Sequence, residues 1–300
     1  MVEQSGMRIG IDIGGSKIAA VILDAEGREQ ARCRSDMPRD YAGTVETISE
    51  TVGRLEGRAQ RAGHIGISMP GVVNGAGEPV LMANLSWLQG KPFRPDLERV
   101  LDRPVHIGND ANCFALSEAT DGAAAGARTV FGVILGTGVG GGITIDGRVI
   151  GGANATAGEW GHNPLPWRET SDGTEIRCGC GQTGCIETWL NGAALSRDYL
   201  SLAGRTAAPE EISRLAGEGD ASARQAISRY ETRLARALAA AINFLDPDVI
   251  VLGGGLSAIS SLYTNVPRLW SRHASSNAAL TRLVKAEHGP DSGVRGAAWL

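Results

Sequence analysis

The chain has no apolar run long enough to cross a membrane and no excess of positive charge. Its apolar stretches, such as 130–135 and 249–252, are far shorter than the roughly 20 residues of a transmembrane helix. The formal net charge is −4, so there is no basic field to attract nucleic acid or an anionic membrane. Residues 1–6 contain Glu3 and no apolar segment, so we expect no signal peptide. These absences favour a cytoplasmic protein whose partners are small molecules.

Cysteine is scarce and unevenly placed. The chain has five cysteines, an odd number that does not suit a disulfide framework, and three of them lie within 178–185. This pattern fits a reducing compartment and a metal site better than disulfide bonds. Cys33 and Cys113 lie in strand-like and helix-like stretches, where we expect buried thiols.

Two parts of the chain carry the same order of predicted elements. Three strands joined by tight turns are predicted over 8–13, 18–23 and 28–35, and the pattern recurs at 130–135, 141–145 and 148–150. Apolar spacing predicts helices over 44–62 and 223–245, and short buried strands are predicted at 64–69, 105–108 and 249–252. Alternating strands and helices predict a duplicated α/β fold with a largely parallel sheet in each of two lobes. A length of 300 residues also favours two lobes.

Glycine is abundant, at 42 of 300 residues, and it gathers where predicted strands end. Such glycines allow positive φ and close approach of a ligand to the backbone. Three loops stand out: Asp12-Ile13-Gly14-Gly15-Ser16-Lys17, Gly136-Thr137-Gly138-Val139-Gly140-Gly141-Gly142 and Gly253-Gly254-Gly255. Each has a plain alternative as a tight or flexible turn. Backbone N–H groups, the Ser16 hydroxyl and the Lys17 cation nevertheless suit phosphate, and two loops at equivalent places suit a nucleoside triphosphate.

Two acidic residues of the first half end predicted strands. Asp12 can hold Mg²⁺ through water. Asp110 follows Asn109 after the strand 105–108, where a carboxylate can accept a proton from a substrate hydroxyl during phosphoryl transfer. The alternative for Asn109-Asp110 is an ordinary helix N-cap, a position that both residue types favour.

The segment Cys178-Gly-Cys180-Gly-Gln-Thr-Gly-Cys185, with His162 upstream, offers three thiolates and an imidazole. This donor set predicts a tetrahedral structural zinc site, the alternative being a redox cluster. Glu159 and Glu187 flank it and can accept hydrogen bonds from sugar hydroxyls, although surface acids remain the plain alternative.

Taken together, these motifs resemble the ROK family (repressors, open reading frames and kinases) over residues 8–300. The resemblance rests on the three glycine loops, on Asn109-Asp110, on Glu159-Trp160-Gly161-His162 and on the segment 178–187. It implies the actin-like/hexokinase (ribonuclease H-like) ATPase fold, with two duplicated lobes around a cleft. The implied lobes are 1–120, completed by 290–300, and 121–289, the latter holding the zinc site. The family is usually dimeric, so a homodimer is implied.

The resemblance also implies the roles of individual residues. Asp110 is the general base. ATP and Mg²⁺ lie between the lobes. Around the sugar are Asn84, Asn109, Asp110, Glu159, His162 and Glu187. The nucleotide and its Mg²⁺ are bound by Asp12, Gly14, Gly15, Ser16, Lys17, Gly136, Thr137, Gly138, Gly140, Gly141, Gly254 and Gly255. The Zn²⁺ ligands are His162, Cys178, Cys180 and Cys185.

The implied activity is ATP-dependent phosphorylation of a hexose at its 6-hydroxyl. Residues 83–88 and 159–167 look like those of bacterial fructokinases of the mannofructokinase type, so we expect fructose, with mannose or glucose as further substrates. N-acetylglucosamine kinase is the alternative, and Trp87 could occupy the space of an N-acetyl group or simply be a packed tryptophan. A repressor is not expected, because the first strand begins near Arg8 and Asp110 is present. A catalytically silent sugar sensor is the rival class.

Overall fold

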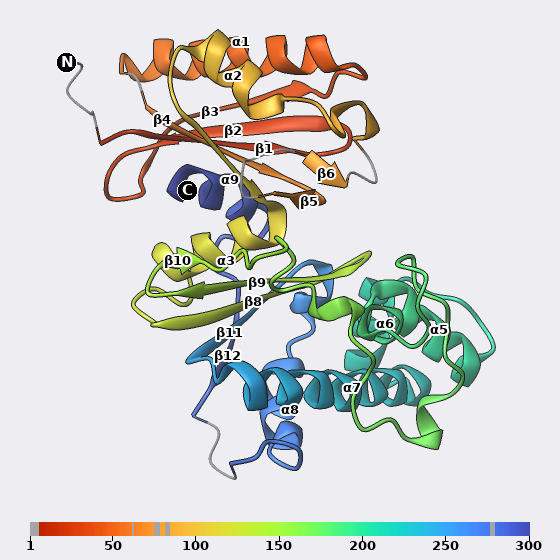
Figure 1. The fold of residues 1–300 in the computed structure, drawn as a ribbon. Helices are drawn as coiled ribbons and strands as arrows, with labels where there is room; N and C mark the ends of the chain where they lie inside the picture. Colours follow the sequence, from red (N-terminus) through yellow and green to blue (C-terminus); the bar gives the residue numbers. More distant parts are fainter. Residues whose placement is uncertain (1–5, 62, 75–78, 82–84, 277–279) are drawn as a thin grey trace. The chain divides into compact units, whose positions relative to one another are not determined.

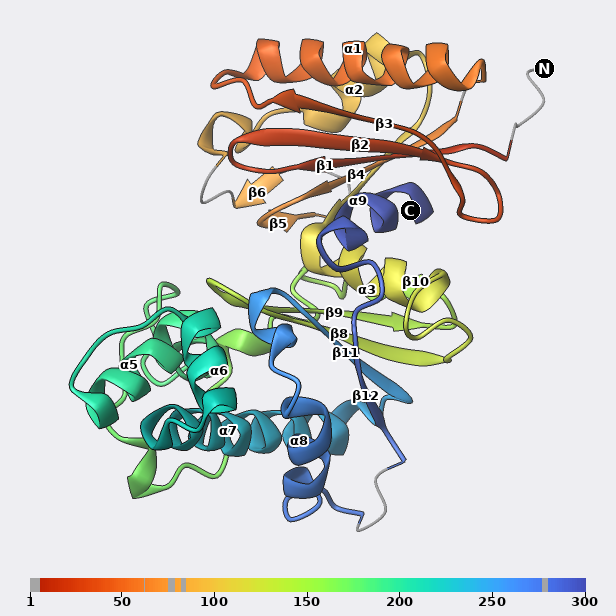
Figure 2. The same cartoon turned by 180° about the vertical axis from the view of Figure 1, so that it is seen from behind.

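The structure is a computed structural model that describes residues 6–61, 63–74, 79–81, 85–276 and 280–300 (Figures 1 and 2). The chain forms two compact units. The first consists of Met1–Gly126, Gly142–Ala157 and Glu287–Leu300, and the second of Ala127–Gly141 and Gly158–Ala286. None of the helices in the described part of the chain has the length and apolar character that crossing a bilayer needs.

The first unit is built on a sheet with the strand order β3-β2-β1-β4-β7. Helices α1 and α2 lie on one face of this sheet, and the C-terminal helix α9 lies on the other (Figure 1). Apolar side chains of β1, β4, α1 and α2 form the core between the sheet and helices α1 and α2. The elements are β1 (Arg8–Ile13), β2 (Lys17–Leu23), β3 (Glu29–Asp36), α1 (Tyr41–Ala59), β4 (His64–Met69), β5 (Val72–Val73), β6 (Pro79–Leu81), η1 (Ser86–Leu88), α2 (Phe93–Leu101), β7 (Val105–Asn109), α3 (Asp110–Thr120), η5 (Gly289–Asp291) and α9 (Ser292–Trp299).

The second sheet has the order β10-β9-β8-β11-β12, which repeats the first sheet position by position. The helices α4 to α8 all belong to the second unit, whereas β10 and residues 142–145 of β9 fall within the range of the first. The elements are β8 (Thr129–Leu135), β9 (Val139–Ile145), β10 (Arg148–Val149), η2 (Trp160–His162), η3 (Thr170–Asp172), α4 (Ile186–Leu190), α5 (Gly192–Ala203), α6 (Pro209–Glu218), α7 (Ala221–Leu245), β11 (Val249–Gly253), η4 (Gly255–Ala258), α8 (Leu262–Trp270) and β12 (Arg282–Lys285). The predicted duplication is confirmed.

The expectation of largely parallel sheets was wrong in part, because both sheets are mixed. Strands β1, β2 and β3 pair antiparallel, as do β9 and β10, whereas β1, β4 and β7 pair parallel, as do β8, β11 and β12. The physical reason is the short turns that join the first three strands of each copy, since a short turn can join only antiparallel neighbours.

Glycines inside the strands bring α9 into backbone contact with the first sheet. A β-carbon at Gly10 would lie 1.9 Å from the Val294 carbonyl oxygen, and one at Gly66 would lie 1.8 Å from that of Ala297. Both distances are far below van der Waals contact, so any larger residue would push the helix off the sheet. This packing places α9 directly behind the strands whose ends carry the candidate catalytic acids.

Candidate functional site

In the first unit, three parallel strands bring the predicted acids to one edge of the sheet. Asp12 of β1 pairs with Ser68 of β4, and Met69 of β4 pairs with Asn109 of β7. Asp110 follows Asn109 as the first residue of α3. Since the carboxyl ends of parallel strands share an edge, Asp12 and Asp110 lie on the side where α/β sheets bind ligands.

Asn109, rather than Asp110, caps the N-terminus of α3. The Asn109 side chain accepts from the N–H groups of Ala111 at 2.9 Å and Asn112 at 3.2 Å, and it donates to the Gly71 carbonyl at 2.9 Å. The Asp110 carboxylate accepts from the Ala111 N–H at 2.8 Å. Asp110 therefore lies in the first turn of α3, where the helix N-terminus favours negative charge.

Asp12 is held in place by a neighbouring hydroxyl. Its Oδ1 accepts from the Ser68 Oγ at 2.7 Å. Burial raises its pKa above the ordinary value, although the Ser68 bond and the Lys17 charge oppose that rise. Burial, followed by the negative charges of Asp12 and Asp110, also raises the pKa of the Cys113 thiol, so Cys113 stays neutral. The prediction that Cys33 and Cys113 are buried, unpaired thiols is confirmed.

The first glycine loop is the turn between β1 and β2. The Gly14 N–H donates to the Lys17 carbonyl at 2.9 Å, and Gly15, Ser16 and Lys17 are exposed. The turn therefore presents a hydroxyl and a cation to solvent, four and five residues beyond Asp12. Asn84, a predicted sugar ligand, lies outside the described residues.

The other two glycine loops lie together in the second unit. Gly253 of β11 pairs with Ile134 of β8, so both loops follow the same ends of neighbouring strands. The Gly136 N–H donates to the Gly138 carbonyl at 3.0 Å, and the Gly136 carbonyl accepts from the Gly192 N–H at 2.8 Å. The exposed Gly254 and Gly255 begin the turn into η4. The two glycine-rich turns therefore lie at the same end of the second sheet.

Few of these glycines use the positive φ that glycine allows. Only Gly254, at φ 79°, does so, while Gly14, Gly15 and 136–142 do not. Close packing is what requires glycine at positions 141 and 142. A β-carbon at Gly142 would lie 2.3 Å from the Ala111 carbonyl oxygen, and one at Gly141 would lie 2.8 Å from the Trp160 ring.

Gly254→Ala is expected to destabilise the protein by about 2 kcal/mol, because alanine would combine an unfavourable positive φ with a clash. Its β-carbon would lie 2.3 Å from the Leu135 carbonyl oxygen. Thermal unfolding measures the loss. Gly217→Ala in α6 is the control, since its β-carbon meets nothing within 4 Å and alanine favours a helix. An unchanged midpoint for Gly254→Ala would contradict the argument.

The Cys/His motif folds into a compact cluster. One ligand atom from each of His162, Cys178, Cys180 and Cys185 lies within 4.8 Å of the others. The Cys178 Sγ is 3.5 Å from His162 Nδ1, and the Cys180 Sγ is 3.6 Å from the Cys185 Sγ. Zinc–sulfur bonds of about 2.3 Å in a tetrahedron place two sulfurs roughly 3.8 Å apart, so the spacing fits zinc.

The surroundings shift the pKa of each of the three thiols. Burial, with the nearby Cys180 and Cys178 thiols, raises the pKa of Cys185 to about 12. Burial also raises the pKa of Cys178, whereas the backbone N–H of Gln182 lowers that of Cys180. Crowded thiols resist ionisation by themselves, and a bound divalent cation would provide the positive charge that stabilises three thiolates.

Glu187 joins this cluster to the glycine loop. Its Oε2 accepts from the Val139 N–H at 3.0 Å, while its Oε1 lies 3.5 Å from the Cys178 Sγ. Glu159 lies 3.8 Å from the Nε2 of His162, on the opposite side of the imidazole from Cys178. The structure therefore brings Glu159, His162 and Glu187 together around the cluster, and the side chains of Glu159 and His162 are exposed.

Trp160 is a supporting residue that the motif analysis did not assign. Its indole donates to the Gly140 carbonyl at 2.9 Å, and its ring packs edge-on against Phe131 at 5.5 Å. Trp160 therefore helps to hold the glycine loop 136–142 in place. A large aromatic between two predicted ligands, Glu159 and His162, was the available signal.

The fold and these loops define the class as an α/β protein with the actin-like/hexokinase architecture and glycine loops at its strand ends. The ROK family profile matches residues 8–300, and the chain belongs to the ROK family. It is 40% identical over 299 residues to proteins named N-acetyl-D-glucosamine kinase from Photobacterium profundum and Escherichia coli, covering 98% of this chain and 99% of each relative.

Solved structures agree on the fold. The ROK hexokinase from Thermus thermophilus superposes with a TM-score of 0.86 at 32% identity, covering 98% of this chain and 97% of the other. A ROK family glucokinase from Streptomyces griseus, in complex with glucose and AMPPNP, gives 0.76 at 29% identity over 98% of both chains. The predicted fold class is thus confirmed.

Proposed function

We propose that this protein is an ATP-dependent sugar kinase that phosphorylates N-acetylglucosamine at the 6-hydroxyl. The observation that carries the proposal is the 40% identity to N-acetyl-D-glucosamine kinases along nearly the whole of both chains. This identity supports N-acetylglucosamine, the alternative substrate, over the fructose that residues 83–88 and 159–167 led us to expect. A sugar- and ATP-binding protein also suits the likeness to the glucokinase with bound glucose and AMPPNP.

Trp87 does not support a pocket that rejects the N-acetyl group. Its indole N–H donates to the Thr44 hydroxyl at 3.1 Å, and its ring packs against the core of the first unit. These contacts support the packed-tryptophan interpretation, so Trp87 gives no argument against N-acetylglucosamine.

In the proposed mechanism, Asp110 accepts the proton of the sugar 6-hydroxyl. The freed oxygen attacks the γ-phosphorus of ATP, the bond to the β,γ-bridging oxygen breaks, and ADP leaves. The glycine loops would hold the phosphates, with Ser16 and Lys17 at one loop and the backbone of Gly136 to Gly141 at another. Glu159, His162, Glu187 and Asn109 would orient the sugar hydroxyls.

Two metal ions have separate proposed places. Mg²⁺, held through water by Asp12, would offset charge on the ATP phosphates. Zn²⁺ would be held by His162, Cys178, Cys180 and Cys185 and would act structurally, because a closed set of four ligands leaves no open position for chemistry.

A coupled ADP-release assay with four sugars tests the proposal. We expect kcat/KM for N-acetylglucosamine to exceed those for fructose, mannose and glucose by at least about tenfold, the scale of one well-placed hydrogen-bonding contact. A preference for fructose would restore the first expectation. Sugar binding without ADP release in the presence of Mg²⁺ would instead indicate the sugar-sensor class.

A further inference from the structure

The segment 163–177 joins His162 to Cys178 and therefore connects two of the proposed zinc ligands. It runs mostly exposed over the surface of the second unit, and only Leu165 and Asp172 of it are buried. A loop with so few buried side chains is poorly fixed unless specific bonds hold it. Asp172 supplies such bonds.

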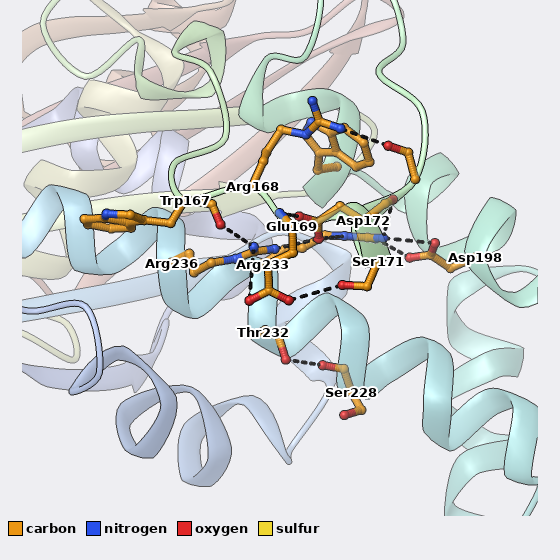
Figure 3. Close-up of polar contacts among 12 residues, drawn as sticks. Trp167, Arg168, Glu169, Ser171, Asp172, Asp198, Ser228, Thr232, Arg233 and Arg236 are labelled. Carbon is orange, nitrogen blue, oxygen red and sulfur yellow. Dashed lines mark hydrogen bonds and ion pairs between the residues drawn. The ribbon is translucent and has the colours of Figure 1, made fainter.

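The Asp172 carboxylate receives two buried guanidinium groups from one helix (Figure 3). Its Oδ1 accepts from Arg233 Nε at 3.1 Å and from Arg236 Nη2 at 2.6 Å, while its Oδ2 accepts from the Glu169 N–H at 2.8 Å. Arg233 and Arg236 stand three residues apart on α7 and are 2% and 1% exposed. Asp198 of α5 pairs with Arg233 from the other side.

The same arginines also hold the loop backbone. Arg233 Nη2 donates to the Asp172 carbonyl at 3.0 Å, and Arg236 Nη1 donates to the Trp167 carbonyl at 2.7 Å. Trp167 has φ 46°, an unfavourable backbone conformation for a bulky residue. Such a conformation persists only where the surroundings fix it, and the bond from Arg236 is one such restraint.

The network continues to the other side of the metal cluster through Trp189 of α4. The guanidinium carbons of Arg233 and of Arg168, which lies in the loop, are each 5.2 Å from the Trp189 ring. The Trp189 indole donates to the Gly184 carbonyl at 3.2 Å, next to Cys185. One network thus contacts the loop after His162, the loop before Cys178 and the turn before Cys185.

Stability alone is a weak reason to bury these charges. Desolvation of an ion pair often cancels its attraction, and apolar residues of similar size are frequently as stable. Burial opposes ionisation of Asp172, but the bonds from Arg236, Glu169 and Arg233 outweigh it and hold the pKa below its usual value. The carboxylate is therefore charged at neutral pH and bonds in a defined direction.

We infer that Asp172, Arg233 and Arg236 are positioning residues that hold the 163–177 segment so that His162 and the three cysteines are preorganised for a metal ion. The inference rests on the proposed metal site. Preorganised ligands lose less entropy on binding, so release of the loop weakens metal affinity even where all four ligands remain.

The test is metal affinity in the full chain. Apo protein is titrated with Co²⁺, whose spectrum reports tetrahedral thiolate ligation, and the Zn²⁺ Kd is measured by competition with a chromophoric chelator. Asp172→Asn is expected to raise the Kd at least about tenfold, the usual effect of losing a group that orients metal ligands. Arg236→Lys keeps the charge but cannot serve both Asp172 and the Trp167 carbonyl, so it should raise the Kd severalfold.

Glu118→Gln is the matched control, because Glu118 is a buried acid of the first unit that accepts from Ser292 at 2.8 Å. It should lower thermal stability and leave the Kd unchanged. Wild-type protein without a stoichiometric Co²⁺ spectrum would refute the metal site itself. Tight binding by wild type with an unchanged Kd in folded Asp172→Asn, or in Arg236→Lys if the first does not fold, would refute the positioning role alone.

Discussion

Asp110→Asn is expected to lower kcat by about 10²- to 10⁴-fold, because asparagine cannot accept the proton of the sugar 6-hydroxyl. The change is nearly isosteric, and the amide oxygen can still accept from the Ala111 N–H that Asp110 contacts at 2.8 Å. The start of α3 should therefore survive, and so should sugar binding. Steady-state ADP release measures kcat, and calorimetric titration with N-acetylglucosamine measures binding.

Asp102→Asn is the control for the loss of one negative charge in the same unit. Asp102 is exposed and ends α2 at φ 52°, a conformation that asparagine adopts readily. Its kcat should match wild type. An Asp110→Asn enzyme with wild-type turnover would remove Asp110 from the mechanism, and one that no longer binds sugar would make it a binding residue instead.

Strand and helix positions could be predicted because local patterns determine them. Strand β4 occupies 64–69 as predicted, and α7 ends at Leu245, where Asp246 takes φ 49° before Pro247. The two predicted sets of three strands joined by tight turns correctly indicated that the second sheet repeats the first. The expectation of largely parallel sheets gave too much weight to the strand–helix alternation, although the predicted tight turns already implied antiparallel neighbours.

Contacts between distant residues could not be predicted in the same way. Gly10 and Gly66 resemble ordinary strand glycines in the sequence, yet each admits the backbone of a helix more than 200 residues away. Arg233 and Arg236 are another case. A helical pattern predicts that arginine lies on the exposed face of the helix. Residues 233–239 of α7 are nevertheless all buried, and both arginine side chains form ion pairs with Asp172 of the 163–177 segment.

The candidate site was more predictable than its supports, since catalysis and metal binding require particular residue types at short spacing. The cluster of His162 with three cysteines followed from the motif alone, and the structure brings these four residues together. What the motif could not reveal is that Glu187 bonds to the Val139 N–H and approaches Cys178, so that the cluster and the glycine loop share one side chain.

Because of that shared side chain, loss of the proposed metal would have two consequences. Without a cation, three crowded thiols replace three thiolates, and the turn 178–185 loses the bonds that fix it. Glu187, in the helix that begins directly after Cys185, would then shift, and its bond to the Val139 N–H beside Gly138 would be disturbed. Metal loss should therefore lower the turnover of ATP as well as the stability of the fold.

Removal of the metal with a chelator, followed by return to buffer with Mg²⁺, is expected to lower the unfolding midpoint by about 10 °C and kcat/KM more than about tenfold. Cys180→Ser should reproduce both losses, because it removes one ligand. Cys33→Ala, which alters a buried thiol of the first unit, should keep full metal content and activity. Metal analysis, thermal unfolding and ADP release on the same samples measure the effect, and full activity in demonstrably metal-free protein would show that the cluster does not need zinc.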